Sequence, residues 1–382
     1  MQAPIVIVGS GLAGYMAAKE LRKLDKTVPI TIVTANRGDF YSKPLLSTAL
    51  TQGKTAEQLA MQSADAMATQ LDARIVTQKA VKAINPADKT IQLGGELIQY
   101  DRLVLALGAK VRPLSFLQGD AVTDVYAVND LEAYAKFREF IEGKKKIAIL
   151  GTGLVGCEFA SDLHNAGYEV IIIAPEPTPL ALFVPEQAGQ YLKSALQAKG
   201  IRWYSEKLVT KVDHAADGYQ VTLGDGQNLV VDGVLAAIGI TPSLDLAQAA
   251  GLKVNQGIVV DQFLRTSDPY IYALGDCAEV QGQVRQYVAP ILQCSRVLAK
   301  TLSGNETSLC YPCMPILVKT PACPVVACPP SPSAEGSWHF EEGEGKFSAL
   351  YYSANDKLLG FVLMGDAVRD KVDLVKKVTM SA

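Results

Sequence analysis

Two glycine-rich turns constrain the fold of this chain more than any other feature of its sequence. Residues 9–14 read Gly-Ser-Gly-Leu-Ala-Gly, and residues 151–156 read Gly-Thr-Gly-Leu-Val-Gly. Each turn follows an apolar, strand-like run and precedes a stretch with helical periodicity. In that context the glycines allow a tight turn and the close backbone approach that a pyrophosphate needs at a helix N-terminus. The sequence therefore predicts two dinucleotide-binding units.

The order of apolar and helical runs predicts an α/β fold. Residues 1–8 are expected to form the first strand and residues 30–34 the second, with a helix at residues 13–24 between them. The same strand, helix and strand recur from residue 147 to residue 174. Units of this kind build parallel sheets that helices cover, so we expect two Rossmann-like domains.

A change of composition near residue 309 predicts a further domain. Prolines accompany short β-rich runs from that point, which indicates a small α+β domain at the C-terminal end. Gly108 and Gly239 each close a strand before a proline-containing loop, so both are expected at crossings between domains. The expected domains are residues 1–110 together with 240–308, residues 111–239, and residues 309–382.

Composition excludes several classes of function. The 382 residues carry a net charge of −3 and no basic block interleaved with aromatics, so we expect no nucleic-acid partner. The longest apolar runs are strand-sized, far short of the roughly 20 residues of a membrane span. Seven unevenly spread cysteines do not form the framework of a small secreted domain, which favours a reducing cytoplasm. The oligomeric state, monomer or homodimer, stays open.

The second strand of each unit should end near a ribose-binding residue. No acidic residue stands directly after the strand in either unit, so Asn36 and Glu176 are the candidate ribose partners. Between Gly167 and Gln190 there is no Lys or Arg to receive a 2′-phosphate. The second unit is therefore predicted to prefer NADH over NADPH.

Three further motifs bring a family resemblance. Residues 266–278 form a strand that ends in Gly275 and Asp276, and residues 103–109 and 235–242 each close a strand with a glycine. With the two glycine turns, these segments resemble the two-dinucleotide flavoprotein reductases of the glutathione reductase superfamily, over nearly the whole chain. In that family the acid corresponding to Asp276 binds the ribityl chain of FAD. The resemblance implies a glutathione reductase-like fold with a C-terminal domain that covers the flavin.

The resemblance also assigns cofactors to the two turns: the first takes FAD and the second takes NADH. The residues it implies at FAD are Gly9, Gly11, Leu12, Ala13, Gly14, Asn36, Lys43, Pro44, Val81, Ala106, Gly108, Gly275, Asp276, Pro290 and Lys319. Those it implies at NAD are Gly151, Gly153, Leu154, Val155, Gly156, Glu158, Glu176, Ile238 and Gly239.

Within the superfamily, residues 41–48 and 318–321 are most similar to the bacterial rubredoxin reductases and their relatives, the oxygenase-coupled ferredoxin reductases. This likeness implies Lys43, Glu158 and Lys319 as catalytic residues, with Lys43 near flavin N5 and paired with Glu158. The family usually presents a second basic residue near Thr48, which this chain lacks. The alternative for Glu158 is an ordinary acid in the first turn of a helix. The alternative for Lys319 is a solvated strand lysine.

The residues that are missing indicate where the electrons go. Disulfide reductases of the superfamily hold a cysteine beside the flavin, but the first cysteine here is Cys157. They also need a histidine for thiol exchange, and none of the three histidines stands in a recognisable His-Pro setting. We therefore expect transfer of single electrons to a separate carrier, for which the resemblance implies rubredoxin and an alkane-hydroxylating oxygenase.

Four cysteines near the C-terminus, Cys310, Cys313, Cys323 and Cys328, allow three interpretations. The first is packed thiols, which we favour; the others are a metal site and a redox switch. Their spacing matches no standard ligand framework, so we expect no bound metal. A fused rubredoxin would need two Cys-x-x-Cys knuckles, and only one is present.

Three rival functions stay open at the level of sequence. The chain could reduce a ferredoxin, or a flavorubredoxin of a nitric oxide system, because both kinds of reductase share its motifs. A rival of another class is a flavin-binding sensor that responds to NADH without turnover. Kinetics with each carrier protein distinguish a ferredoxin or flavorubredoxin reductase from the predicted rubredoxin reductase. The rate at which NADH bleaches the flavin separates these three reductases from the sensor.

Overall fold

The computed structural model describes residues 3–378, which pack as two compact units. Unit 1 contains residues 3–43, 60–110 and 240–311, and unit 2 contains residues 44–59, 111–239 and 312–378. The expected first strand at residues 1–8 is found as β1 (Ile5–Val8), while residues 1 and 2 lie outside the described residues. The division into three domains stays a prediction.

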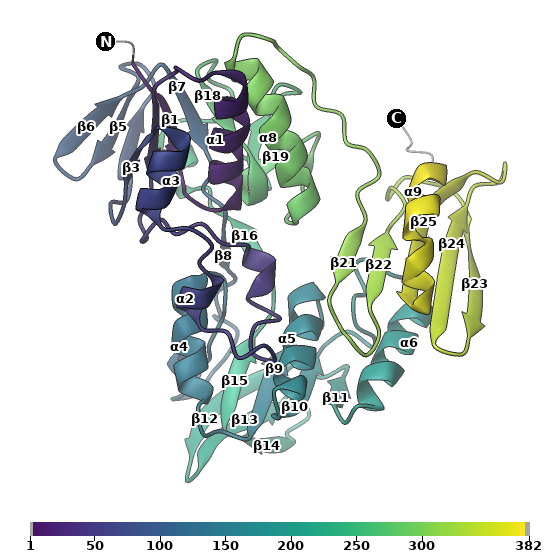
Figure 1. The fold of residues 1–382 in the computed structure, drawn as a ribbon. Coiled ribbons are helices and arrows are strands. Elements are labelled where there is room, and N and C mark those ends of the chain that lie inside the picture. Colours follow the sequence, from purple (N-terminus) through teal and green to yellow (C-terminus); the bar gives the residue numbers. More distant parts are fainter. Residues whose placement is uncertain (1–2, 379–382) are drawn as a thin grey trace. The chain divides into compact units, whose positions relative to one another are not determined.

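Unit 1 is built on a parallel sheet in the order β18-β7-β1-β2-β3 (Figure 1). Its strands are β18 (Ile271–Ala273), β7 (Arg102–Leu105), β1 (Ile5–Val8), β2 (Ile30–Val33) and β3 (Arg74–Val76). Every residue of β1 and β2 is buried, as expected for strands of a parallel sheet that is covered on both faces. The long helices α1 (Leu12–Leu24) and α8 (Val288–Leu302) lie side by side (Figure 1).

Smaller elements complete unit 1. The helices are α3 (Ala64–Leu71) and α7 (Asp245–Ala249), with the 3-10 turn η3 (Gly275–Cys277). The 3-10 turn η1 (Lys43–Leu45) begins at Lys43 of unit 1 and continues into the first segment of unit 2. One small antiparallel sheet consists of β4 (Ala83–Asn85), β5 (Thr90–Leu93) and β6 (Glu96–Gln99). A second sheet consists of β17 (Ile258–Val260), β19 (Ala278–Val280) and β20 (Gln283–Val284). The strands β8 (Ala109–Val111) and β16 (Ile240–Pro242) pair with each other.

Unit 2 repeats the parallel architecture in the order β11-β10-β9-β15. Its strands are β11 (Arg202–Ser205), β10 (Glu169–Ala174), β9 (Lys146–Leu150) and β15 (Gly233–Ala236). Its helices are α2 (Ala56–Leu59), α4 (Leu131–Ile141), α5 (Leu154–Asn165) and α6 (Glu186–Gln197), with the 3-10 turn η2 (Val122–Asp124). Phe137 and Phe159 pack edge to face in its core.

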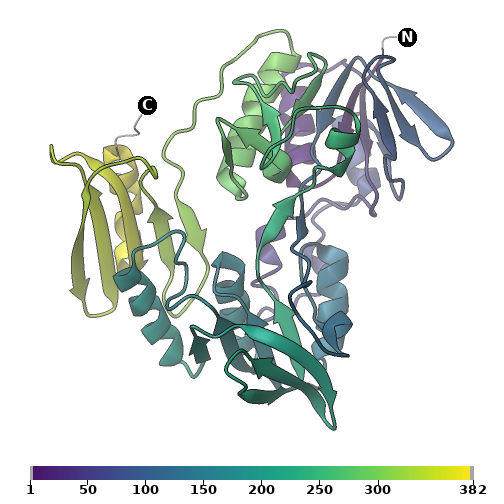
Figure 2. The ribbon, with the colours of Figure 1, turned by 180° about the vertical axis from the view of Figure 1, so that it is seen from behind.

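An antiparallel sheet extends unit 2 beyond the parallel strands. It contains β12 (Val209–Ala215), β13 (Gly218–Leu223) and β14 (Asn228–Val231), which form the teal hairpins seen from behind in Figure 2. β13 alternates between buried and half-buried residues, as expected for a strand with one face on the core.

The C-terminal part of unit 2 is a mixed layer of strands and one helix. The sheet order is β21-β22-β25-β24-β23, from β21 (Ile316–Val318), β22 (Val325–Cys328), β25 (Leu358–Gly365), β24 (Lys346–Tyr352) and β23 (Ser337–Gly343). After the 3-10 turn η4 (Asp366–Asp370), α9 (Lys371–Lys377) packs on β25, and α6 contacts β24 and β25 (Figure 1). The predicted fold class, two Rossmann-like sheets with a small α+β C-terminal part, is confirmed.

No helix within residues 3–378 has the length and apolar character needed to cross a membrane.

Candidate functional site

The first glycine turn joins β1 to α1 in unit 1, and two of its glycines are required by the protein's own backbone. Gly9 has a φ of +113°, and a Cβ there would overlap the carbonyl oxygen of Ala106. A Cβ on Gly14 would overlap the carbonyl oxygen of Gly9. These two glycines therefore close the turn and let α1 approach the sheet.

The second turn, between β9 and α5 in unit 2, has the same construction. Gly151 has a φ of +108°, and a Cβ there would lie 2.6 Å from the carbonyl oxygen of Ala237. A Cβ on Gly156 would overlap the carbonyl oxygen of Gly151. In both turns, therefore, glycine avoids an overlap with a backbone carbonyl oxygen.

The middle glycines test whether these turns fit a dinucleotide. A Cβ on Gly11 or Gly153 would meet no described atom within 4 Å, and the φ angles of −66° and −70° suit any residue. Both glycines are helix N-caps that make no side-chain cap bond, which leaves the helix N-termini open toward a ligand. No described protein atom explains why positions 11 and 153 are glycine. The close approach of a pyrophosphate to the helix N-terminus does explain it.

The predicted ribose residue of unit 1, Asn36, is held by its own surroundings. Its Oδ1 accepts hydrogen bonds from the Ser10 hydroxyl at 3.2 Å, the Thr34 hydroxyl at 2.8 Å and the Gly38 amide at 3.1 Å. Asn36 can therefore offer a ribose only the donor side of its amide.

Asp276 lies in the turn η3, directly after the strand β18. Gly275 has a φ of +78°, and a Cβ there would lie 2.7 Å from the Cβ of Ala13, so this turn lies against the start of α1. Burial raises the pKa of the Asp276 carboxyl, although the ammonium of Lys43, 3.9 Å away, acts in the opposite direction. The carboxylate is largely buried, with 14% of the side chain exposed, and it can bind hydroxyl groups of a ligand.

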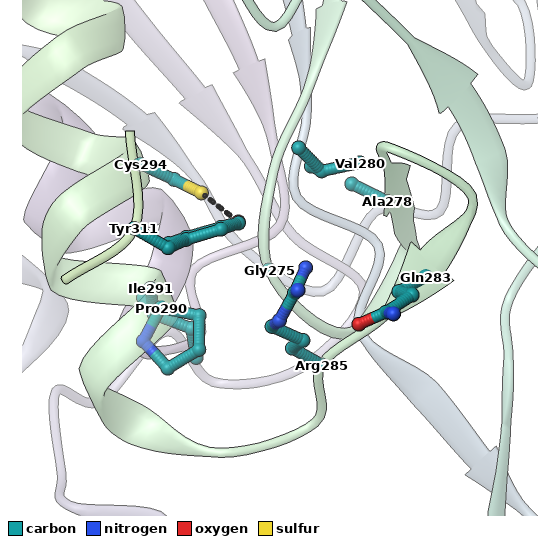
Figure 3. Close-up of a pocket in the computed structure, with 9 residues that line it drawn as sticks. All are labelled: Gly275, Ala278, Val280, Gln283, Arg285, Pro290, Ile291, Cys294 and Tyr311. Atoms are coloured by element: carbon teal, nitrogen blue, oxygen red, sulfur yellow. Dashed lines mark hydrogen bonds between the residues drawn. The ribbon is translucent and has the colours of Figure 1, made fainter. Parts of the chain in front are cut away.

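A pocket next to this turn lies at the N-terminal end of α8 (Figure 3). Its lining residues are Gly275, Ala278, Val280, Gln283, Arg285, Pro290, Ile291, Cys294 and Tyr311. The Cys294 sulfur and the Tyr311 hydroxyl hydrogen-bond at 3.1 Å (Figure 3), and the Arg285 guanidinium lies 4.6 Å from the Tyr311 ring centroid. Burial raises the pKa of Cys294 to about 11, so Cys294 stays a thiol.

Two nitrogens beside this helix are buried without a hydrogen-bond partner among the described residues: Nη1 of Arg285 and Nε2 of Gln286. Buried donors of this kind need an acceptor, and a flavin ring offers carbonyl oxygens and ring nitrogens at its edge. These donors fit FAD in unit 1. No sequence motif marks either residue, because each is a single polar side chain in a loop.

In unit 2, Glu158 is buried near the start of α5, and three protein donors contact its carboxylate. Its Oε2 accepts a bond from the Ser47 hydroxyl at 2.5 Å and lies 3.1 Å from the Lys319 ammonium. Its Oε1 accepts a bond from the Lys319 backbone amide at 2.9 Å, and the Lys319 ammonium also donates to the Pro44 carbonyl. Lys319 is thus neither a solvated strand lysine nor an isolated charge.

Ser47 and Asp162 are functional candidates that sequence reasoning missed. The Asp162 carboxylate accepts bonds from the amides of Leu50 and Thr51, each at 2.9 Å, and so ties residues 44–59 to α5. The expected FAD domain, residues 1–110 with 240–308, includes residues 44–59, so this contact with α5 was not predicted. Lys43 belongs to unit 1 and Glu158 to unit 2, so the pairing of Lys43 with Glu158 stays a prediction.

The predicted ribose residue of unit 2, Glu176, is exposed just beyond β10. Its carboxylate accepts one long bond, 3.4 Å, from the Thr152 hydroxyl in the glycine turn. A lysine outside residues 167–190 contacts the residue after Glu176. Lys193 of α6 donates to the Pro177 carbonyl at 3.3 Å and to the Ser205 hydroxyl at 2.7 Å.

The remaining predicted positions are distributed over both units. In unit 1, Ala106 and Gly108 follow β7, Leu12 and Val81 pack against the core, and Pro290 lies in the first turn of α8. In unit 2, Leu154 and Val155 open α5, Val155 with its side chain exposed, and Ile238 and Gly239 follow β15.

The cysteines do not form a metal centre in the part of the chain that the structure describes, where no group of three or more metal-ligating side chains converges. Cys323 is buried in the main core of unit 2, whereas Cys310 is exposed.

Comparison with known proteins identifies the family. Residues 3–293 match the family model described as pyridine nucleotide-disulphide oxidoreductase. The chain belongs to the pyridine nucleotide-disulphide oxidoreductases. The predicted membership is therefore confirmed. Residues 308–378 match a second model, described as the rubredoxin binding C-terminal domain.

Individual relatives within this family match the whole chain. A rubredoxin-NAD(+) reductase from Alcanivorax borkumensis is 47% identical over 98% of each chain. A nitric oxide reductase FlRd-NAD(+) reductase from Aliivibrio fischeri is 36% identical over 99% of each chain. The crystal structure of a ferredoxin reductase from Rhodopseudomonas palustris, 26% identical, has a TM-score of 0.89 and covers 99% of this chain and 96% of that one.

Proposed function

We propose that this protein is an NADH-dependent FAD flavoprotein that passes electrons singly to rubredoxin. The observation that carries the proposal is the combination of two dinucleotide turns with residues 308–378, which match a rubredoxin-binding model. A curated relative of nearly half identity over the full length bears the name rubredoxin-NAD(+) reductase.

FAD binds to unit 1 in this proposal. The N-terminus of α1 at Gly11 would hold its pyrophosphate, and the Asp276 carboxylate would accept hydrogen bonds from its ribityl hydroxyls. Arg285 and Gln286, whose buried nitrogens lack hydrogen-bond partners among the described residues, would donate hydrogen bonds to the flavin edge. When bound, FAD supplies the chemistry of accepting two electrons from a reduced nicotinamide and releasing them one at a time.

NADH binds to unit 2, with its pyrophosphate at the N-terminus of α5 over Gly153 and a ribose on Glu176. Glu176 accepts ribose hydroxyls and repels a 2′-phosphate, which favours NADH over NADPH. Lys193 acts against this preference because its ammonium lies against the Pro177 carbonyl, one residue beyond Glu176. Positioning of the nicotinamide, rather than acid or base chemistry, is the main contribution of these residues.

Lys43, Glu158 and Lys319 are the proposed catalytic residues. In unit 1, Lys43 holds its ammonium near Asp276 and can donate to the flavin. In unit 2, Ser47 and Lys319 fix the Glu158 carboxylate in one orientation. Anaerobic NADH-driven flavin reduction in Lys43→Met tests the first role: we expect a slower rate, and an unchanged rate contradicts it.

The second candidate function is reduction of FlRd, the protein that appears in the name of the Aliivibrio relative. The 36% identity to that relative supports this candidate. The rubredoxin proposal rests on the higher identity and on the C-terminal match. A role in alkane hydroxylation and a cytoplasmic location belong to the same proposal; the cysteines, all free in the structure, support the latter.

Stopped-flow kinetics test the proposed function. NADH should bleach the flavin rapidly, and added rubredoxin should reoxidise it faster than an equal concentration of ferredoxin. Because rubredoxins are acidic, the reoxidation rate should fall as salt is added. Rubredoxin that reoxidises no faster than buffer would contradict the proposal. Slow bleaching without turnover would instead support the sensor.

A further inference from the structure

The structure brings together two cysteines that the sequence does not pair. The Cys313 and Cys328 sulfurs lie 2.9 Å apart and share a hydrogen bond. The obvious pair by spacing is Cys310 with Cys313, a Cys-x-x-Cys. The antiparallel register of β21 and β22, with Ile316 opposite Ala327, explains the observed contact, because it places the residues before β21 next to the end of β22.

We propose that Cys313 and Cys328 are a dithiol that a hydroperoxide oxidises to an intramolecular disulfide. A disulfide bond is about 2.0 Å long, so the two sulfurs need to approach by only about 1 Å. The pair lies within residues 308–378, so its oxidation modifies the part of the chain that matches the rubredoxin-binding model.

The two thiols have different surroundings, which gives each a role. Cys313 is half-buried, and the hydrogen bond from Cys328 lowers its pKa. Cys328 is buried against Phe361 and Leu363, and its hydrogen bond with Cys313 and its burial both raise its pKa. Cys313 is therefore the accessible sulfur that becomes a thiolate, and Cys328 is the protonated partner that stays beside it.

The reaction balances in two steps. The Cys313 thiolate attacks the terminal oxygen of the hydroperoxide, the O–O bond breaks, and an alcohol (water, when the oxidant is hydrogen peroxide) leaves after protonation. The Cys328 sulfur then attacks the sulfenic sulfur of Cys313, the S–O bond breaks, and the hydroxyl leaves as water with the Cys328 proton. Two electrons pass from the sulfurs to the peroxide, and a dithiol reductant reverses the change by exchange.

The new bond would fix a particular place in unit 2. Cys313 lies one residue after Pro312, where the chain enters its last segment of that unit. Cys328 ends β22, so the disulfide would tie this entry point to the sheet and enclose the hairpin of β21 and β22. A constraint on this loop should raise the temperature at which unit 2 unfolds.

Peptide mapping of the full-length FAD-loaded protein tests the pair. After hydrogen peroxide treatment, alkylation of the denatured protein should show the loss of two of its seven thiols, and dithiothreitol should restore them. Trypsin cuts after Lys319, which separates Cys313 from Cys328 and yields a linked pair of peptides.

Matched variants identify the linked sulfurs, because each tryptic peptide holds a second cysteine. We expect the link to persist in Cys310→Ser and Cys323→Ser and to disappear in Cys313→Ser and Cys328→Ser. Flavin content and circular dichroism check the folding of each variant. If Cys328→Ser does not fold, the wild type, Cys310→Ser and Cys323→Ser still show whether the link forms without Cys310 or without Cys323. A link through Cys310 or Cys323 would overturn the proposal, as would seven intact thiols at peroxide levels that oxidise a small thiol.

Discussion

The two dinucleotide turns of this chain are alike in their glycines and different beyond them. In both units the first and third glycines make room for backbone carbonyls, and the middle glycine faces open space. In unit 1 the side chain after the second strand, Asn36, accepts three hydrogen bonds from its own unit. In unit 2 the corresponding side chain, Glu176, accepts one long bond.

This difference suits one tightly held and one exchanging ligand. Unit 1 adds the largely buried carboxylate of Asp276 and two buried donors, on Arg285 and Gln286, that lack hydrogen-bond partners among the described residues. Groups of that kind are satisfied by a ligand that stays bound. The exposed carboxylate of Glu176 costs little when no ligand is present. The same turn can therefore serve a resident cofactor and a substrate.

The largest expected effect tests what the two turns share. Gly14→Ala and Gly156→Ala each push a methyl group into a backbone carbonyl that cannot move away without opening the turn. We expect each to lower the free energy of unfolding of the apoprotein by about 3 kcal/mol. Chemical denaturation measures this loss. If one variant is destabilised and the other is not, the two turns are not equivalent.

The fold was largely predictable because its signals are local. The apolar residues of β1 and, after Lys146, of β9 mark buried parallel strands whatever surrounds them, as do the glycines that follow both strands. The membership of residues 44–59 in unit 2 was not predictable. It depends on the carboxylate of Asp162, which binds amides more than 100 positions away in the sequence.

Asp276→Asn tests the largely buried carboxylate that follows Gly275, next to the start of α1. The pKa of Asp276 is raised on folding, so the native state binds its proton more tightly than the unfolded chain. Stability of the apoprotein should therefore fall as the pH rises from the unfolded value of 3.8 through the raised native value. The Asn variant should be the more stable apoprotein at neutral pH and equal to wild type in acid.

The same variant should bind FAD more weakly by about 2 kcal/mol, because a neutral amide replaces a charged acceptor. Urea titrations at several pH values and flavin titration measure the two effects. Asp245→Asn is the control in unit 1. The side-chain hydrogen bond from Lys110 lowers the pKa of Asp245, so the pH dependence of its contribution has the opposite sign. A destabilised Asp276→Asn apoprotein at neutral pH would contradict this account.

The middle glycines separate the two ligands. Gly11→Ala should lower FAD affinity at least tenfold, about 1.4 kcal/mol, and Gly153→Ala should do the same to NADH. Neither methyl group meets a described atom, so the apoproteins should stay within about 0.5 kcal/mol of wild type. Flavin content after purification and NADH titration give the two affinities. A Gly153→Ala protein that loses flavin rather than NADH would reverse the assignment.

The candidate site was predictable only where a motif marks it. Asp276 and Glu158 stand at fixed places in motifs, whereas Ser47, Arg285 and Gln286 acquire their roles from contacts or from unpartnered burial. Lys193 shows the same limit. Residues 167–190, which surround Glu176, contain no Lys or Arg. Lys193, three residues beyond them in α6, nevertheless donates to the Pro177 carbonyl.

The smallest expected effect comes from substitutions at the two predicted ribose residues, Asn36 and Glu176. It tests whether Asn36 stabilises the protein while Glu176 binds the ligand. Asn36→Ala removes an acceptor from Ser10, Thr34 and the Gly38 amide, so it should cost the apoprotein about 1 kcal/mol. Glu176→Ala should leave stability unchanged and weaken NADH by a similar amount, with a smaller loss for NADPH. Lys193→Ala is the matched control and should weaken NADPH more than NADH. Equal losses of stability in Asn36→Ala and Glu176→Ala would remove the distinction between the two units.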